Sequence, residues 1–133
     1  MAKYVYPAIF KEEKNGDISV TFPDFEGCST FGHDIIDALA MAGDSLSLML
    51  YDMEEDGDEI PDATPLQEIK TNKTSFASYI SVDTLEYRKR FHNRAVKKTL
   101  SVPEWLNDSA MAAGLNFSQI LQDGLKKALN IAL

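Results

Sequence analysis

Residues 94–106 read Arg-Ala-Val-Lys-Lys-Thr-Leu-Ser-Val-Pro-Glu-Trp-Leu, and this stretch decides the fold of the C-terminal third of the chain. Residues 96–102 alternate in polarity, which predicts a short strand with one apolar and one polar face. Pro103 ends this strand and suits the first turn of a helix, because its missing N–H costs nothing there. The stretch therefore predicts a strand followed directly by a helix that contains Trp105.

A second helix follows in residues 116–129, which read Asn-Phe-Ser-Gln-Ile-Leu-Gln-Asp-Gly-Leu-Lys-Lys-Ala-Leu. Gly114 suits the left-handed position that ends the preceding helix. Asn116 is a good N-cap, with Gln119 as its capping-box partner. Three apolar stripes this small cannot close a core alone, so we expect a second copy of the chain to complete it.

A dimer of strand-helix-helix units presents a two-stranded ribbon, which fits the major groove of DNA. The polar face of the strand would read bases, and the free N–H groups that open the second helix would hold a phosphate. The expected base-reading residues are Lys97, Thr99 and Ser101. The expected phosphate-binding residues are Arg94, Lys98, Asn116, Phe117 and Ser118. The expected dimer core consists of Leu100, Val102, Trp105, Ile120 and Leu121. The same pattern also fits a tail that only dimerises.

Charge divides the chain into two parts. The net charge is −8, but residues 1–86 hold 18 acidic and 5 basic side chains, a net charge of −13. Residues 87–133 hold 3 acidic and 8 basic side chains, a net charge of +5. Such asymmetry predicts two modules with different partners, DNA for the basic part and a basic protein for the acidic part. One cysteine, Cys28, and no apolar run long enough for a membrane favour a cytoplasmic protein.

The first part of the chain predicts a small α+β layer. Alternating residues from Tyr4 to Phe10 predict a strand, and the Asn15-Gly16 pair predicts a tight hairpin. Further strands are expected at residues 18–22, 28–31 and 75–82. Between them a helix capped by Asp34 would bury Ile35, Leu39, Ala42, Leu46, Met49, Leu50 and Met53. The expected order is β-β-β-α-β in residues 1–83, then a linker at 84–93 with a helical turn or two docked through Leu85 and Tyr87, then the strand-helix-helix domain at 94–133.

Several motifs resemble the HicB antitoxin family. They are Tyr6-Pro-Ala-Ile-Phe10, the run from Gly16 to Thr30 that includes Phe-Pro-Asp-Phe-Glu-Gly-Cys, Asp37-Ala-Leu, and Asp58-Glu-Ile-Pro61. Residues 93–106 and 116–122 are similar to the version of that family with a C-terminal ribbon-helix-helix domain. The resemblance implies a partial ribonuclease H-like N-terminal domain that masks HicA, a small basic toxin that cleaves mRNA. It also implies a C-terminal domain that dimerises and represses the operon encoding both proteins.

Some residues of the first part of the chain also fit other functions. Asp24, Glu26, Asp34 and Asp37 could serve a metal-dependent nuclease, but their positions predict turn and capping roles instead. We therefore expect no enzyme activity, no metal and no cofactor. A stand-alone repressor whose N-terminal part senses a small ligand is the alternative function. For toxin binding, the turn Asp24-Phe25-Glu26 combines an aromatic side chain with two acids, although Phe25 folded inward is an equally good interpretation.

Overall fold

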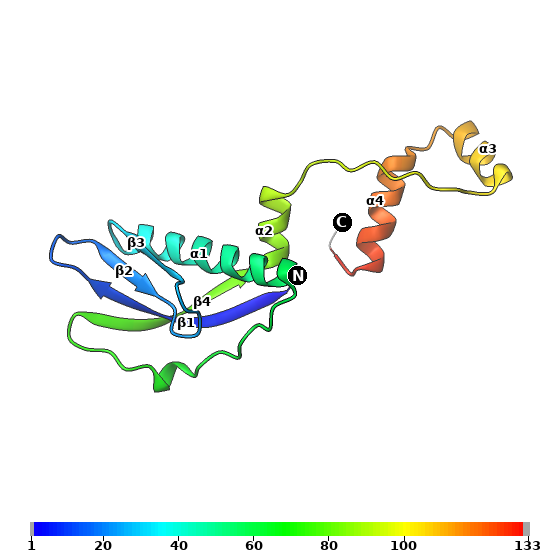
Figure 1. The fold of residues 1–133 in the computed structure, drawn as a ribbon. Coiled ribbons are helices and arrows are strands. Elements are labelled where there is room, and N and C mark those ends of the chain that lie inside the picture. Colours follow the sequence, from blue (N-terminus) through cyan, green and yellow to red (C-terminus); the bar gives the residue numbers. More distant parts are fainter. Residues whose placement is uncertain (1, 132–133) are drawn as a thin grey trace. The chain divides into compact units, whose positions relative to one another are not determined.

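The computed structural model describes residues 2–131 (Figure 1). Its contacts divide the chain after Arg94 into two compact units, each of which is described by itself. In chain order the elements are β1 (Lys3–Glu12), β2 (Ile18–Thr21), β3 (Ser29–Gly32), α1 (Ile35–Asp56), the 3-10 helix η1 (Leu66–Glu68), β4 (Ser75–Asp83), α2 (Thr84–Phe91), α3 (Glu104–Ala112) and α4 (Phe117–Ala128). The expected α+β class and the β-β-β-α-β order of the first unit are both present.

The first unit is built on one antiparallel sheet with the strand order β3-β2-β1-β4. The hairpin between β1 and β2 forms at the predicted place, where Gly16 takes a φ of 90°. The side chain of Asn15 stabilises this turn by accepting a hydrogen bond of 3.0 Å from the Asp17 N–H. The fourth strand returns along the other side of β1, so the first and last strands of the unit lie next to each other.

Helix α1 covers one face of this sheet, and the core lies between them (Figure 1). From the sheet the core contains Tyr6, Ala8, Phe10, Val20, Ile80 and Val82, and from the helix Ala38, Ala42, Leu46 and Leu50. The sequence prediction for the helix was wrong at Ile35 and Leu39, whose side chains are 41% and 44% exposed. The buried face is rotated toward the small residue Ala38, because the helix starts in very close contact with β3. A Cβ atom on Gly32 would lie 2.2 Å from the Ala38 backbone nitrogen.

The ends of α1 are fixed by local hydrogen bonds, as its sequence predicts. The Asp34 carboxylate accepts a bond of 2.8 Å from the Asp37 N–H, which makes Asp34 the N-cap. The Asp37 carboxylate in turn accepts a bond of 2.9 Å from the N–H of His33, the residue before the N-cap. At the other end Gly57 takes a left-handed φ of 70° and stops the helix inside its acidic run.

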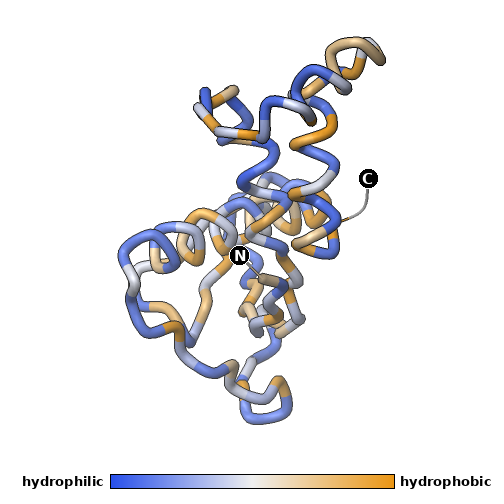
Figure 2. Tube along the Cα trace, turned by 90° about the vertical axis from the view of Figure 1, so that its right-hand side faces the viewer, coloured by the Kyte–Doolittle hydropathy of each residue, from blue (hydrophilic) through white to orange (hydrophobic). Residues whose placement is uncertain are grey.

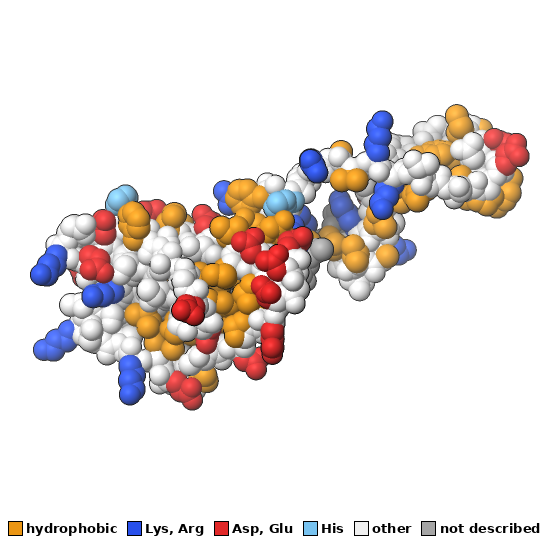
Figure 3. Space-filling view, in the orientation of Figure 1, with side chains coloured by type: hydrophobic (Ala, Val, Ile, Leu, Met, Phe, Trp, Pro, Cys, Tyr) orange, Lys and Arg blue, Asp and Glu red, His pale blue; other side chains and the backbone are white. Residues whose placement is uncertain are grey.

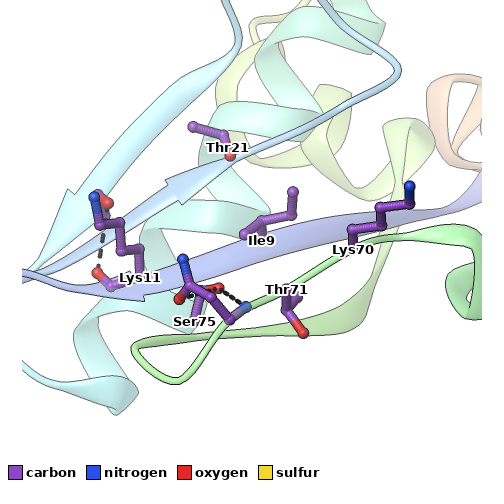
Figure 4. A pocket seen from close by; sticks show the side chains of 8 residues that line it. Ile9, Lys11, Thr21, Lys70, Thr71 and Ser75 are labelled. Atoms are coloured by element: carbon purple, nitrogen blue, oxygen red, sulfur yellow. Dashed lines mark hydrogen bonds between the residues drawn. The ribbon is translucent and has the colours of Figure 1, made fainter.

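The other face of the sheet is partly covered by the loop between α1 and β4. Together they form an open hollow of about 420 Å³ lined by Ile9, Lys11, Ser19, Thr21, Lys70, Thr71, Asn72 and Ser75 (Figure 4). Asn72 and Ser75 already bond each other, since the Ser75 hydroxyl donates to the Asn72 side-chain oxygen at 3.1 Å. The lining of this open hollow also includes the polar side chains of Thr21, Lys70 and Thr71.

Residues 84–93 form a longer helix than the helical turn or two expected in the linker. Most of the segment forms helix α2, which is capped by the Asp83 carboxylate and packs against α1. Tyr87 and His92 both contact the Tyr51 ring, at centroid distances of 5.3 and 4.7 Å. The first unit therefore extends to Arg94 rather than ending at Asp83.

The second unit contains two helices joined by a short turn. Helix α3 follows Pro103, and Gly114 takes a φ of 67° just after the helix, as the sequence predicts. Asn116 caps α4 by accepting a bond of 3.0 Å from the Gln119 N–H. The capping box is incomplete, because the Gln119 side chain donates instead to Asp123 at 2.8 Å. No strand forms at residues 96–102 in the single chain, since a lone ribbon strand has nothing to pair with.

Candidate functional site

The apolar side chains of the second unit are exposed. Hydrophobic residues recur along both of its helices (Figure 2), yet none between Ala95 and Ile131 is buried in the single chain. Trp105 is 69% exposed, and Leu100 is 62% exposed. The rest of the expected dimer core, Val102, Ile120 and Leu121, is also exposed. A folded unit with no interior of its own is incomplete, because uncovered apolar surface of this extent normally marks an association surface.

The residues expected to contact DNA are all accessible. Lys97, Thr99 and Ser101 lie on the extended segment before α3, and each is exposed. Asn116, Phe117 and Ser118 lie at the start of α4, where the first N–H groups of the helix remain available to an anion. Arg94 and Lys98 are exposed as well. The single chain leaves these residues exposed but does not gather them into one surface.

The turn Asp24-Phe25-Glu26, which was predicted to contact a toxin, packs largely against the first unit itself. Phe25 is only 5% exposed, and its ring packs edge-on against the Tyr6 ring at a centroid distance of 4.6 Å. Asp24 accepts hydrogen bonds from the N–H and the hydroxyl of Thr64, at 3.1 and 2.6 Å. Only Glu26 projects freely into solvent. The interpretation with Phe25 as an exposed contact is therefore wrong for this conformation, because the ring gains more by filling the core.

Glu54 forms a polar cluster that the sequence did not predict. Its carboxylate accepts hydrogen bonds from the Tyr4 hydroxyl at 2.8 Å and the Thr84 hydroxyl at 2.9 Å, and it pairs with Arg88 at 3.3 Å. Burial alone would raise the pKa of Glu54, but all the hydrogen bonds to its carboxylate, those from Tyr4, Thr84 and Arg88 among them, together outweigh it and lower the pKa to about 2. Burial and the bond to Glu54 raise the pKa of Tyr4 to about 12. One carboxylate thus joins β1, α1 and α2.

Replacing Glu54 by glutamine should lower the free energy of unfolding at pH 7 by about 2–3 kcal/mol, because buried donors lose a charged acceptor. The lowered pKa of Glu54 means that its contribution is fully present above about pH 5 and is lost as the pH falls toward 2. Urea unfolding of both proteins between pH 7 and pH 2 measures this, and the two curves should converge at low pH. Glu55→Gln, at a half-exposed position that also contacts Arg88, should cost less than about 1 kcal/mol. A constant difference at every pH would contradict the assignment.

The unit boundary changes the charge division. The first unit carries 18 acidic and 9 basic side chains, a net charge of −9, and the second carries 3 and 4, a net charge of +1. Much of the positive charge assigned to the DNA-binding part lies in α2, where Arg88 and Lys89 form ion pairs. Figure 3 shows acidic side chains gathered near the C-terminal end of α1 and basic ones near the β1–β2 hairpin. The first unit therefore carries a strongly negative net charge, while the net charge of the second unit is only weakly positive.

Cys28 and His33 contact other parts of the first unit. Cys28 is buried in the core, and burial raises the pKa of its thiol. Exposed His33 contacts Asp17 at 3.1 Å, and this hydrogen bond raises the pKa of its imidazole. Within residues 2–131 no three His, Cys, Asp or Glu side chains gather as metal ligands would. None of the helices described there combines the length and apolar character that crossing a bilayer requires.

The architecture matches a known family. The profile described as the HicB-like antitoxin of bacterial toxin-antitoxin systems matches residues 6–123. This chain belongs to the HicB-like antitoxin family. The match begins in β1 and ends in α4, so it covers most of the first unit and the second unit as far as residue 123. Among curated proteins, none matches the antitoxin in sequence.

Solved structures resemble the antitoxin over 60–95% of its length. A chain from a toxin-antitoxin complex of Streptococcus pneumoniae is 30% identical with a TM-score of 0.60, over 95% of this chain and 99% of that one. The antitoxin HicB of Burkholderia pseudomallei is 16% identical with a TM-score of 0.54, over 95% and 98% of the two chains. A chain of a HicA3–HicB3 toxin-antitoxin complex is 16% identical with a TM-score of 0.50, over 60% of this chain and 99% of that one. The last two similarities show the fold alone.

Proposed function

We propose that this antitoxin neutralises a HicA-type toxin through its first unit and represses its own operon through its second unit, bound to operator DNA as a dimer. The observation that carries the proposal is the family match, which extends across both units. A second feature supports the proposal. Residues 96–102 are long enough for a strand, and the apolar residues of the following helices α3 and α4 are exposed in the single chain. The chain itself performs no catalysis in this proposal.

The DNA-binding half of the proposal rests on the second unit, residues 95–131, which we call the tail. Two copies of residues 96–102 paired as a ribbon would turn Lys97, Thr99 and Ser101 to one face and Leu100 and Val102 to the other. The apolar face would then cover the exposed residues of α3 and α4. The polar face would meet the base edges in the major groove, while the N-terminus of each α4 would hold a phosphate.

The toxin-binding half of the proposal rests on charge and on the first unit's independence. This unit carries the net charge of −9 and contains all of the buried apolar residues of the described chain. An acidic surface suits a basic toxin, because complementary charge speeds association and orients the partner. In the turn at residues 24–26, Glu26 offers an exposed carboxylate, and Asp24 is half-buried beside it.

The experiment that tests the proposal compares the full chain with a chain that ends at Arg94. Both are tested for binding to the DNA upstream of the coding sequence across a salt series, and for rescue of cells that express the neighbouring toxin. We expect both chains to bind the toxin, and only the full chain to bind DNA with a steep salt dependence. DNA binding by the shortened chain, or failure of both chains to bind the toxin, would contradict the assignment of units.

Thr99→Ala should weaken operator binding by about 1–3 kcal/mol and relax sequence preference at one base position, because a base contact is lost. Titration of operator DNA and of the same DNA altered at single positions measures both effects. Thr71→Ala is the matched control, since this exposed threonine lies in the first unit and should leave DNA affinity unchanged. Unchanged affinity and unchanged preference in Thr99→Ala would remove this residue from the base-reading set.

A further inference from the structure

Strand β4 forms one edge of the sheet, and half of its backbone groups face outward. At the two ends of the β1–β4 ladder, the Thr84 N–H donates to the Ala2 carbonyl at 3.0 Å and the Glu12 N–H donates to the Thr74 carbonyl at 2.9 Å. The register pairs even-numbered residues of β4 with β1 in the same way. Because backbone direction alternates along a strand, odd-numbered residues point to the free edge. These are Ala77, Tyr79 and Ser81 in the middle of the strand.

The outward groups are unpaired in the described part of the single chain. Within residues 2–131, no backbone hydrogen bond reaches the N–H groups of Ala77, Tyr79 or Ser81 from outside the sheet. The Tyr79 carbonyl accepts only a 3.3 Å bond from the neighbouring Ser78 hydroxyl. A row of unpaired N–H and C=O groups like this is a ready template for another strand.

Strand β4 also lacks the features that usually protect an edge. It has no proline, glycine or lysine over its nine residues, and its first charged residue is Asp83 at its last position. Two large side chains on it are half-exposed, Phe76 at 47% and Tyr79 at 50%. Soluble proteins normally block long edges with charges, prolines or bulges. The outer edge of β4 is therefore suited to pairing with another strand.

We propose that β4 pairs in antiparallel fashion with β4 of a second copy of this chain, across a two-fold axis normal to the sheet. The pairing would join two four-stranded sheets into one continuous sheet, with both α1 helices on the same face. This interface goes beyond the proposed function, because it requires neither the toxin, the DNA nor the tail. It is a second self-association surface, separate from the one in residues 95–131.

The side chains of β4 are complementary to themselves in one register. With Ser78 on the two-fold axis, Phe76 lies opposite Ile80 of the second copy on the helix face of the sheet. On the other face Tyr79 lies opposite the small Ala77. A large side chain therefore meets a smaller one at each position, and both half-exposed aromatic rings become covered.

Charge also favours an antiparallel second copy over a basic partner. Lys73 lies two residues before β4 and Asp83 ends it. An antiparallel pair brings Lys73 of each copy near Asp83 of the other, whereas a parallel pair would place like charges together. Between these two residues the strand carries no acid that could attract a basic protein. The acidic side chains instead gather near the C-terminal end of α1 (Figure 3).

Amide hydrogen exchange of the full-length protein tests this pairing directly. We expect the N–H groups of Ala77, Tyr79 and Ser81 to be protected at high protein concentration and to lose protection on dilution. The N–H groups of Ser78 and Ile80, which belong to the β1 ladder, should stay protected throughout. Fast exchange of the three outward groups at every concentration would overturn the proposal. Protection that arises only when a toxin is added would also overturn it, by making the toxin the occupant.

A pair of double variants separates the edge from general charge effects. Ala77→Lys with Ser81→Lys places lysines on the edge strand, and Ser19→Lys with Thr21→Lys places the same charges on β2, on the same sheet face. Both are made in the chain ending at Arg94, which contains its complete core. Sedimentation equilibrium should show a dimer for the parent and the β2 variant, and an increase of about tenfold or more in Kd for the edge variant. A monomeric parent, or equal weakening in both variants, would overturn the proposal.

Discussion

Trp105→Ala should abolish dimerisation through the tail at micromolar concentration, with a loss of about 3–5 kcal/mol in association free energy. The indole is 69% exposed in the single chain and lies among other uncovered apolar residues of α3 and α4. In the proposed dimer this ring is buried between copies, so its removal should act on association rather than on the core of the first unit. A loss of this size corresponds to roughly a hundredfold or greater increase in Kd.

The measurement follows protection of the α4 amides against hydrogen exchange as the full chain is diluted, which reports on the tail whatever the first unit does. Trp105→Phe is the control, because phenylalanine keeps an aromatic ring and should preserve most of the protection. The amides of β1 should be unaffected in both variants. Protection of α4 in Trp105→Ala that equals the parent at low concentration would show that Trp105 lies outside the dimer core.

Phe25→Ala is the second change with a large expected effect. The free energy of unfolding should fall by about 3–5 kcal/mol, because the ring is 5% exposed and packs on Tyr6 inside the core. Urea or thermal unfolding of the full chain measures this. Glu26→Ala, at the adjacent exposed position, should change stability by less than about 0.5 kcal/mol. If Phe25→Ala instead kept full stability and lost toxin binding, the ring would be a contact residue that turns outward in the complex.

Local sequence patterns predicted the parts of the fold that local chemistry controls. Asn15-Gly16 marked the hairpin, Asp34 and Asn116 marked helix starts, and Gly114 marked a helix end, and all four are confirmed. Each of these signals depends on a hydrogen bond or a dihedral angle within a few residues. The strand order was not predicted, because alternation says which face is buried but not which strand pairs with which.

Long-range interactions account for what the sequence did not reveal. Glu54 and Arg88 lie 34 residues apart, so nothing in the acidic run around Glu54 distinguished it from its solvated neighbours. The unit boundary at Arg94 depends on that same pair and on Tyr51, whereas the docking of α2 through Tyr87 agrees with the sequence prediction. Phe25 illustrates the opposite limit, since an aromatic residue in a turn fits both the core and a partner surface. Only the packing against Tyr6 decided between them.

The uncovered tail makes the completeness of this antitoxin depend on its abundance. The first unit folds by a unimolecular process, because all of its buried contacts lie within one chain. In the proposed dimer the tail obtains its interior from another chain, so mass action governs it, and doubling the number of copies doubles the rate at which a given chain finds a partner. On that proposal a scarce antitoxin combines a folded first unit with a tail that lacks its interior, so its exposed helices α3 and α4 would be more accessible to proteases than those of the dimer.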